Sequence, residues 1–453
     1  MLIRLVVNNF LSFGEEREFN MLPNERYKKL PHHTYSVGSE SVLKLAAVYG
    51  ANAAGKSNLV KALEVLKSFV NQKKIPIDIG INRFRFDEAL QDGAVALAVE
   101  FWAREKAFVY GVEFCDDFVL TEELYESGLG IRDDRLVFRK YVQDGKTQIE
   151  FSKGFSRSKK NQLLESVLED NLLKDDESAL RFLATLKVPE LADVELAAHW
   201  FDQTLQIITP SEIARGLPHF LDINSQLAEY ANQLMRTYHL GVAAVEIERL
   251  SLDEFVGRDN PSASRSIMQD LADSHHNFIT LKSGKGDIVC AVQEDDKIVV
   301  KRLRIRHTTP SGKERVFEMG EESDGTKRLL DFVLTFFAVV RQGTVFVIDE
   351  IERSLHPNLI KQLIHKFSHD DRTNGQLIFT THESNLLDQN ILRRDEIWFA
   401  EKDSFGSTDL YSLSKFREHH TMDIRKGYLT GRYGGIPFTG NLEELNWHDY
   451  DLV

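Results

Sequence analysis

The sequence predicts an α/β fold: a mixed sheet with covering helices plus an antiparallel β lobe, interrupted by a helical insertion. Two stretches alternate between strand-like and helix-like patterns, one near the start of the chain and one beyond residue 325. Such alternation is typical of a sheet covered by helices. Between them, residues 156–240 show helical periodicity and many charges. We therefore expect residues 1–155 and 241–453 to form the two halves of one core, with 156–240 inserted between them.

The first half is expected to contain one helix and several strands. Leu59, Leu63, Leu66 and Val70 recur at helical spacing, which predicts a helix over residues 57–69. Apolar runs and alternation with a period of two indicate the strands, two of which should pair as a hairpin. The expected strands are 2–7, 43–49, 95–102, 108–114, 118–124, 136–141 and 148–151.

The insertion and the second half show the same two periodicities. Residues 179–186 and 196–205 are predicted to be helical, and 242–250 and 288–306 are predicted to be strand-like. The last expected elements are a helix at 326–340, a strand at 344–348, a helix at 358–367 and a strand at 376–380.

Composition excludes several classes of protein. The chain has 453 residues, 42% hydrophobic and 28% charged, which rules out a collagenous or wholly disordered chain. Its net charge of −14 argues against a protein that coats nucleic acid with its whole surface, although a local basic patch stays compatible with it. Cys115 and Cys290 lie far apart in the sequence, which argues against a disulfide framework or a thiolate zinc site. No apolar run approaches the roughly 20 residues of a membrane span, so we expect a cytoplasmic protein.

Residues 50–57, GANAAGKS, match the phosphate-loop pattern GxxxxGK[ST] between a predicted strand and a predicted helix. Glycines let backbone N–H groups point at phosphate oxygens, and the helix N-terminus favours negative charge. Lys56 would bridge the β- and γ-phosphates of ATP, and Ser57 would supply a hydroxyl to Mg²⁺. The alternative is a chance match, against which the flanking elements argue. The expected nucleotide-binding residues of the loop are Gly50, Asn52, Ala53, Ala54, Gly55, Lys56, Ser57 and Asn58.

Residues 345–350, VFVIDE, form an apolar run that ends in two carboxylates. Adjacent strand positions face opposite ways, so Asp349 can bind the magnesium ion while Glu350 polarises the attacking water. An apolar run that ends in Asp-Glu is weak evidence alone, because many such runs are ordinary strand ends. The phosphate loop strengthens it.

Two further segments resemble elements of the ABC class of ATPases. Residues 322–328, ESDGTKR, resemble its signature loop, in which a serine and a glycine (here Ser323 and Gly325) bind the γ-phosphate from a helix N-terminus. Residues 380–383, TTHE, place His382 where that class has its switch histidine, and 351–357 resemble its D-loop. The alternatives are a helix cap for Ser323 and an ordinary surface histidine for His382.

Together with residues 9–13, NFLSF, these motifs resemble the SMC/RecF/OLD branch of ABC-type ATPases. The resemblance is strongest to prokaryotic anti-phage ATPases of the RloA-like and AbiL-like kind, and weaker to the ATPases of the Septu and PARIS systems. Residues 394–403 and 431–437 carry the more specific similarity.

The resemblance implies an ATP- and Mg²⁺-dependent ATPase that acts as sensor or scaffold in defence. Composite sites are implied, with Ser323 and Gly325 supplied by a second copy in a homodimer or higher oligomer. It also implies a separately encoded effector, of which an HNH or Toprim-type nuclease is the expected kind. The residues after His382 are too few for the Toprim domain of the OLD branch, so no intrinsic nuclease is expected.

The sequence departs from the ABC pattern in places and leaves alternatives open. Asp324 stands where transporter-type members have glycine, and either Gln91 or Gln148 could be the Q-loop glutamine. The runs 169–170 and 175–177 are either solvated helix faces or a docking surface, and 431–437 is either a cap or an interface.

Arg302, Arg304 and Arg306 share one face of a predicted strand. They form either its solvated side or a contact for nucleic acid or an acidic partner. The alternative functions are a RecF-like DNA-binding ATPase of DNA repair and a nucleotide-dependent scaffold with negligible turnover.

Overall fold

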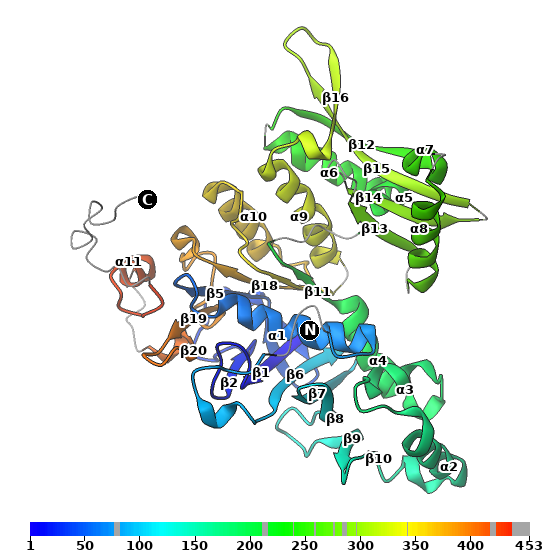
Figure 1. Cartoon of the computed structure of the whole chain (residues 1–453). Coiled ribbons are helices and arrows are strands. Elements are labelled where there is room, and N and C mark those ends of the chain that lie inside the picture. The colour runs from blue at the N-terminus through cyan, green and yellow to red at the C-terminus, as the bar shows by residue number, and fades with distance from the viewer. Residues whose placement is uncertain are drawn as a thin grey trace, which may run out of the picture. The chain divides into compact units, whose positions relative to one another are not determined.

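The computed structural model describes residues 1–76, 82–210, 216–238, 240–257, 260–274, 277–282, 288–295, 297–341, 343–416 and 423–436. The chain divides into two compact units (Figure 1). The first comprises Met1–Ile207, Gly343–Ile351 and Ile364–Val453, and the second comprises Ile208–Gln342 and Glu352–Leu363. The predicted insertion is therefore shared between the units, with its part up to residue 207 in the first.

The described part of the first unit contains a seven-stranded antiparallel sheet, hereafter the antiparallel sheet. Its side chains alternate between buried and partly exposed, as the period of two predicts. In β7, for example, this alternation runs from the buried Phe108 to the partly exposed Cys115. The predicted antiparallel lobe is confirmed. In sheet order its strands are β10 (Lys146–Phe151), β9 (Arg135–Gln143), β8 (Phe118–Glu126), β7 (Lys106–Cys115), β6 (Val95–Ala103), β1 (Leu2–Asn8) and β2 (Arg17–Asn20).

A second sheet of the first unit, hereafter the mixed sheet, has six strands within the described ranges. Strands β17, β18, β5 and β19 pair in parallel, and β20 pairs antiparallel with β19. All six residues of β5 are buried, as expected for a central parallel strand. In sheet order the strands are β11 (Leu205–Ile208), β17 (Val345–Ile348), β18 (Gln376–Thr381), β5 (Leu45–Gly50), β19 (Ile397–Lys402) and β20 (Thr408–Ser412).

Helix α1 (Lys56–Gln72) lies against both β1 and β5 (Figure 1). Leu59, Leu63, Leu66 and Val70, the positions that predicted it, are all buried in the core cluster shared by both sheets. Burial of these apolar side chains, which contributes about 25 cal/mol per Å², stabilises the packing of the helix on the sheets. A small hairpin, β3 (Thr34–Val37) and β4 (Glu40–Leu43), precedes β5.

The part of the insertion that belongs to the first unit holds α2 (Lys159–Val167), α3 (Ala179–Thr185) and α4 (Ala192–His199). The helix predicted at 196–205 is confirmed up to Thr204, although only its part up to His199 is α-helical. A π-helical turn follows, and the chain then becomes strand β11. Trp200 stacks on Phe101 of β6 with ring centroids 4.2 Å apart. This contact links the π-helical turn to a strand that is distant in sequence.

Two buried charges of the antiparallel sheet attach α3 to it. The carboxylate of Glu122 accepts hydrogen bonds from Tyr110 Oη (2.9 Å), Ser178 Oγ (3.0 Å) and the backbone N–H groups of Ala179 (2.6 Å) and Leu180 (2.9 Å). It therefore caps the N-terminus of α3, where negative charge is favourable. Burial, followed by the charge of Glu122, raises the pKa of Tyr110, so its hydroxyl remains a donor.

Lys140 is the second buried charge. Its Nζ donates to the carbonyl oxygens of Lys174 (2.7 Å), Asp175 (3.4 Å) and Glu177 (2.5 Å). Burial lowers the pKa of Lys140, and nearby carboxylates, Glu122 first, oppose that shift. The backbone of the acidic run 175–177 is thus part of an internal anchor.

The described part of the second unit contains a sheet in the order β12 (Val242–Ser251), β15 (Lys297–Thr308), β14 (Ile288–Glu294) and β13 (Phe278–Lys282), with β16 (Glu314–Glu318) also pairing with β15. The single strand-like stretch predicted at 288–306 is two strands. Glu294 pairs with Lys297, and Asp295 adopts φ 50° in the turn between them.

The helices of the second unit were predicted in part. The long helix α9 (Asp324–Arg341) was predicted, whereas α7 (Leu252–Val256) and α8 (Pro261–Asp273) were missed. Local signals existed for both missed helices. Ser251 and Glu254 form a capping box before α7, and Asn260 caps α8 ahead of Pro261. The remaining helices are α5 (Leu217–Ile223) and α6 (Ser225–Thr237).

Two further helices follow in the sequence. Helix α10 (Pro357–His369) begins in the second unit and ends in the first, and α11 (Ile424–Leu429) belongs to the first. None of the helices in the described ranges is long and apolar enough to cross a membrane.

We expect Glu122→Ala to destabilise the protein, because four donors would lose their acceptor in a buried site. The loss should be about 3 kcal/mol in the free energy of unfolding, measured by urea unfolding. Glu123→Ala is the matched control, because that side chain is 34% exposed and pairs with Arg139 at 3.6 Å. It should change stability by no more than about 0.5 kcal/mol. Equal losses in the two variants would contradict the anchoring role of Glu122.

Candidate functional site

The phosphate loop connects the end of β5 to the start of α1. Gly50 and Gly55 are required there by close contacts, because a Cβ on Gly50 would lie 2.5 Å from the carbonyl oxygen of Ala400 and one on Gly55 would collide with Thr408 Oγ1. Ala53 (φ 62°) and Gly55 (φ 105°) both have left-handed backbone conformations. Such alternation turns N–H groups to one side and forms an anion-binding concavity.

Lys56 lies at the first position of α1 and is 5% exposed. Its Nζ donates to the carbonyl oxygens of Gly50 and Ala51 at 3.0 Å and lies 3.0 Å from Nε2 of His382. An ammonium group can only donate hydrogen bonds, so in this contact Nε2 of His382 is the acceptor. The structure thus brings together two predicted site residues that are far apart in sequence.

The carboxylate pair follows β17. Asp349 is buried, and Thr380 Oγ1 donates to its Oδ1 at 2.5 Å. The same Thr380 oxygen accepts the N–H of Glu350 at 2.8 Å. One threonine therefore fixes the backbone and the carboxylate of neighbouring residues.

The predicted geometry of this pair needs a correction. Strand β17 ends at Ile348, so strand alternation does not set the directions of Asp349 and Glu350. Instead, Glu350 adopts φ 50°. A left-handed conformation in a residue with a side chain is strained, and such strain is common at functional sites.

Lys56, Ser57, Asp349, Glu350 and His382 all belong to the first unit. They follow β5, β17 and β18, which are adjacent in the mixed sheet. The carboxyl ends of adjacent parallel strands meet at one edge, which is where such sheets bind ligands. Of the other predicted loop residues, Asn52 and Ala53 are exposed, Ala54 is buried, and Asn58 is partly buried.

Ser323 and Gly325 lie in the second unit, at the start of α9. Ser323 Oγ accepts the N–H of Thr326 at 3.1 Å, so the helix-cap interpretation describes its contact. A Cβ on Gly325 would lie 3.0 Å from the carbonyl oxygen of Ser354, which brings the signature-like and D-loop-like segments together within this unit. His307 fixes the loop from the side, with Nε2 2.6 Å from Glu322 Oε1.

The two candidate Q-loop glutamines lie in different settings. Gln91 Nε2 donates to the carbonyl oxygens of Phe84 (2.7 Å) and Asp87 (3.3 Å) within its own loop. Gln148 lies on β10, the edge strand of the antiparallel sheet, opposite Tyr141. Neither has a hydrogen bond with the phosphate loop among the contacts of the described residues.

Sequence reasoning missed three hydroxyl residues of the site: Ser12, Thr380 and Thr408. Ser12 could have been predicted from the sequence, since it belongs to the NFLSF segment that carried the family resemblance. Thr380 lies two residues before His382. Thr408 has no local signal, because its contact with Ser12 joins positions 396 residues apart.

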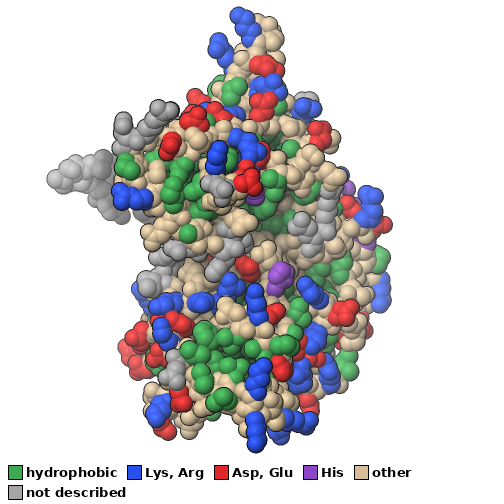
Figure 2. Space-filling model, turned by 90° about the vertical axis from the view of Figure 1, so that its right-hand side faces the viewer, with side chains coloured by type: hydrophobic (Ala, Val, Ile, Leu, Met, Phe, Trp, Pro, Cys, Tyr) green, Lys and Arg blue, Asp and Glu red, His purple; other side chains and the backbone are tan. Residues whose placement is uncertain are grey.

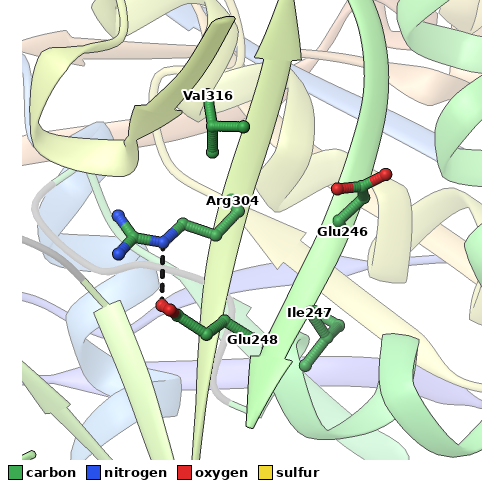
Figure 3. A pocket seen from close by; sticks show the side chains of 5 residues that line it. All are labelled: Glu246, Ile247, Glu248, Arg304 and Val316. Atoms are coloured by element: carbon green, nitrogen blue, oxygen red, sulfur yellow. Dashed lines mark hydrogen bonds and ion pairs between the residues drawn. The ribbon is translucent and has the colours of Figure 1, made fainter.

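The arginine face of β15 is neutralised by glutamates of the neighbouring strands. Arg304 bonds Glu248 at 2.8 Å and Glu318 at 2.9 Å, and Arg306 pairs with Glu246 at 2.7 Å and Glu314 at 2.9 Å. Figure 3 shows Arg304 directed at Glu248 in a hollow also lined by Glu246, Ile247 and Val316.

These contacts favour the interpretation of a half-buried strand over a nucleic-acid contact. Arg302, Arg304 and Arg306 are only 17%, 21% and 32% exposed. On the face in Figure 2, basic and acidic side chains are interspersed instead of forming one continuous basic patch.

Residues 431–436 lie beside the phosphate loop, and Pro437 is outside the described residues. Tyr411 Oη donates to the carbonyl oxygen of Tyr433 at 2.7 Å, and Tyr428 Oη donates to that of Gly435 at 3.2 Å. A Cβ on Gly435 would lie 3.6 Å from the Cα of Gly50. The described part of this segment therefore packs as a cap on the mixed sheet.

The residues present fit a magnesium nucleotide. The left-handed positions of the loop and the ammonium of Lys56 suit a polyphosphate, while Ser57 and Asp349 offer oxygen ligands to Mg²⁺. Magnesium bound with phosphates needs only one or two protein carboxylates. Over the described ranges, no three His, Cys, Asp or Glu residues group as a metal cluster.

Comparisons with known proteins agree with a nucleotide site of this kind. Residues 45–388, more than half of the chain, match a family model described as "AAA domain, putative AbiEii toxin, Type IV TA system". No curated protein matches the sequence.

Three solved structures are similar to the chain at low identity. An SMC head bound to the C-terminal winged-helix domain of ScpA is 13% identical, with a TM-score of 0.41 over 91% of this chain and 97% of its own. The SMC head of Thermotoga maritima is 12% identical, with a TM-score of 0.35 over 91% and 98%. The SMC head with an extended coiled coil bound to the C-terminal domain of ScpA, from Pyrococcus furiosus, is 12% identical, with a TM-score of 0.42 over 95% and 98%. On the family match, the chain belongs to the AAA domain family described as putative AbiEii toxins of type IV toxin–antitoxin systems.

Proposed function

We propose that this protein binds and hydrolyses ATP with Mg²⁺, and that it is the sensor or scaffold of a prokaryotic anti-phage defence system. The observation that carries the ATPase proposal is the convergence of Lys56, the Thr380-bound Asp349, Glu350 and His382 beside β5, β17 and β18. The defence context is supported by the toxin–antitoxin description of the family. The resemblance to anti-phage ATPases supports control of a separately encoded effector, of which an HNH or Toprim-type nuclease fits best.

The loop and Lys56 would hold the triphosphate, and Ser57 and Asp349 would hold a magnesium ion, which would supply charge neutralisation at the phosphates. Glu350 accepts a proton from a water molecule as that water attacks the γ-phosphorus. The bond between this phosphorus and the bridging oxygen breaks, giving ADP and phosphate. Lys56 exchanges its contact with His382 for the phosphates, which leaves the imidazole facing the γ-phosphate.

Ser323 and Gly325 would complete the site of a second copy in a homodimer or higher oligomer. The support is the resemblance to the ABC class and the place of both residues at the start of an 18-residue helix, whose N-terminus favours anions. ATP would then hold two copies together, and hydrolysis would loosen them.

The RecF-like alternative requires a basic surface that is open to DNA. The glutamate pairing of Arg304 and Arg306 disfavours β15 as that surface. DNA-stimulated hydrolysis that weakens with salt and is lost on charge reversal of Arg302, Arg304 and Arg306 would restore the alternative.

Glu350→Gln should bind ATP, retain the ATP-dependent oligomer and lose hydrolysis, because an amide cannot accept the proton from water. We expect kcat to fall on the order of 10²-fold or more, measured by phosphate release, with the oligomer followed by light scattering. The control is Glu383→Gln, whose amide oxygen can still accept the N–H of Asn385. Hydrolysis by Glu350→Gln at the rate of the unmodified protein would show that another group is the base.

His382→Ala should raise the affinity for ADP, because Lys56 would no longer have to leave His382 when phosphates bind. A hydrogen bond to a charged group contributes roughly 1.5 kcal/mol or more, so we expect up to about a tenfold lower Kd by calorimetry. The preference for ATP over ADP should fall at the same time, because the contact with the γ-phosphate is lost.

The control for this experiment is His365→Ala, which changes an exposed histidine of α10. If His382→Ala left ADP binding unchanged and weakened only ATP binding, the Lys56–His382 contact would have no influence on nucleotide affinity.

A further inference from the structure

Two buried hydroxyl groups enclose the last glycine of the phosphate loop. Ser12 comes from the turn that follows β1 and is 7% exposed; Thr408 is the first residue of β20 and is fully buried. Their oxygens lie 2.7 Å apart, and the N–H of Thr408 donates to the carbonyl oxygen of Ser12 at 2.6 Å. A Cβ on Gly55 would collide with Thr408 Oγ1 and lie 2.8 Å from Ser12 Oγ.

The two hydroxyls join Asn58 to Ala54 through hydrogen bonds. The carbonyl oxygen of Ala54 can only accept, and Thr408 Oγ1 donates to it at 2.9 Å. Thr408 Oγ1 also donates to Ser12 Oγ at 2.7 Å, so its one hydroxyl proton is shared between two acceptors. Ser12 Oγ in turn accepts from Nδ2 of Asn58 at 2.8 Å. These hydrogen bonds form a chain of contacts from Asn58 through Ser12 and Thr408 to Ala54.

This chain of hydrogen bonds fixes one peptide plane of the phosphate loop. In a trans peptide the C=O and the following N–H point in opposite directions. Because Thr408 holds the carbonyl of Ala54, the N–H of Gly55 must point away from Thr408, on the opposite side of that peptide plane. The other end of the chain is Asn58 in the first turn of α1, so Lys56 and Ser57 lie between its two attachment points.

We infer that Ser12 and Thr408 are positioning residues for nucleotide binding, which act by holding the Ala54–Gly55 peptide so that the N–H of Gly55 faces the phosphates. This inference rests on the proposed function, since it concerns the same site. Neither residue needs to touch the nucleotide. Their effect is on the orientation of a backbone donor, which a phosphate uses in the bound state and in the transition state alike.

Thr408→Val tests the inference, because valine keeps the shape of threonine and removes the donor. We expect Kd for both ADP and ATP, and KM for ATP, to rise about tenfold, while kcat at saturating ATP stays within about threefold. Thr408→Ser restores the hydroxyl and should restore the affinity. If Thr408 acted in packing alone, the substitution would lower the melting temperature and would not raise KM selectively over kcat.

Ser12→Ala is the second variant, and it decides the matter should Thr408→Val fail to fold. It breaks the chain one link earlier and leaves the bond from Thr408 to Ala54, so we expect a smaller rise in Kd, about threefold. Unchanged Kd values in the folded variants, or a loss that Thr408→Ser does not restore, would overturn the inference. Absence of nucleotide binding by the unmodified protein would instead refute the proposed function.

Discussion

The register of three parallel strands is the constraint on which the site depends. Ile348 of β17 pairs with Phe379 of β18, and Thr381 of β18 pairs with Tyr49 of β5. The residues that follow these pairs, Asp349 and Gly50 among them, therefore reach the same edge of the mixed sheet, with Asp349 at the level of Thr380 and Gly50 two residues further along. Each strand has a fully buried burial pattern, and shifting one by a residue would move its side chains to the other face. Core packing thus holds the residues of the candidate site in register.

Backbone strain at this edge is balanced by contacts from distant parts of the chain. Ala53 and Glu350 have left-handed conformations, which cost of order 1 kcal/mol each in residues with side chains. Thr380 holds Glu350 through its N–H, and Thr408 holds the carbonyl next to Gly55. The antiparallel strand β20 therefore contributes to the site from beside the parallel strands, because it brings the hydroxyl of Thr408 to the phosphate loop.

The parts of the structure that were predictable from sequence are those set by local periodicity. The helical spacing of Leu59 to Val70 and the apolar run before Asp349 were sufficient for α1 and β17. Strand β11 was missed because its place in the mixed sheet depends on long-range packing. The same holds for the site: motif spacing indicated Lys56, Asp349 and His382, but the partners Ser12 and Thr408 meet only through the tertiary fold. The roles assigned to these residues stay predictions, whereas their proximity is a feature of the fold.

Strand β18 links nucleotide binding to the carboxylates because Thr380 and His382 are only two residues apart. Thr380 bonds Asp349 and Glu350, and His382 accepts from Lys56. Lys56 has three protons, which Gly50, Ala51 and His382 satisfy in this structure, so a phosphate must displace at least one of them. Displacement of His382 would remove one contact of the segment directly after Thr380, and a ligand that changes this contact would shift the population of conformations there. The end of β18 therefore connects the phosphate loop, through the hydrogen bonds of His382 and Thr380, to the residues proposed to bind magnesium and activate water.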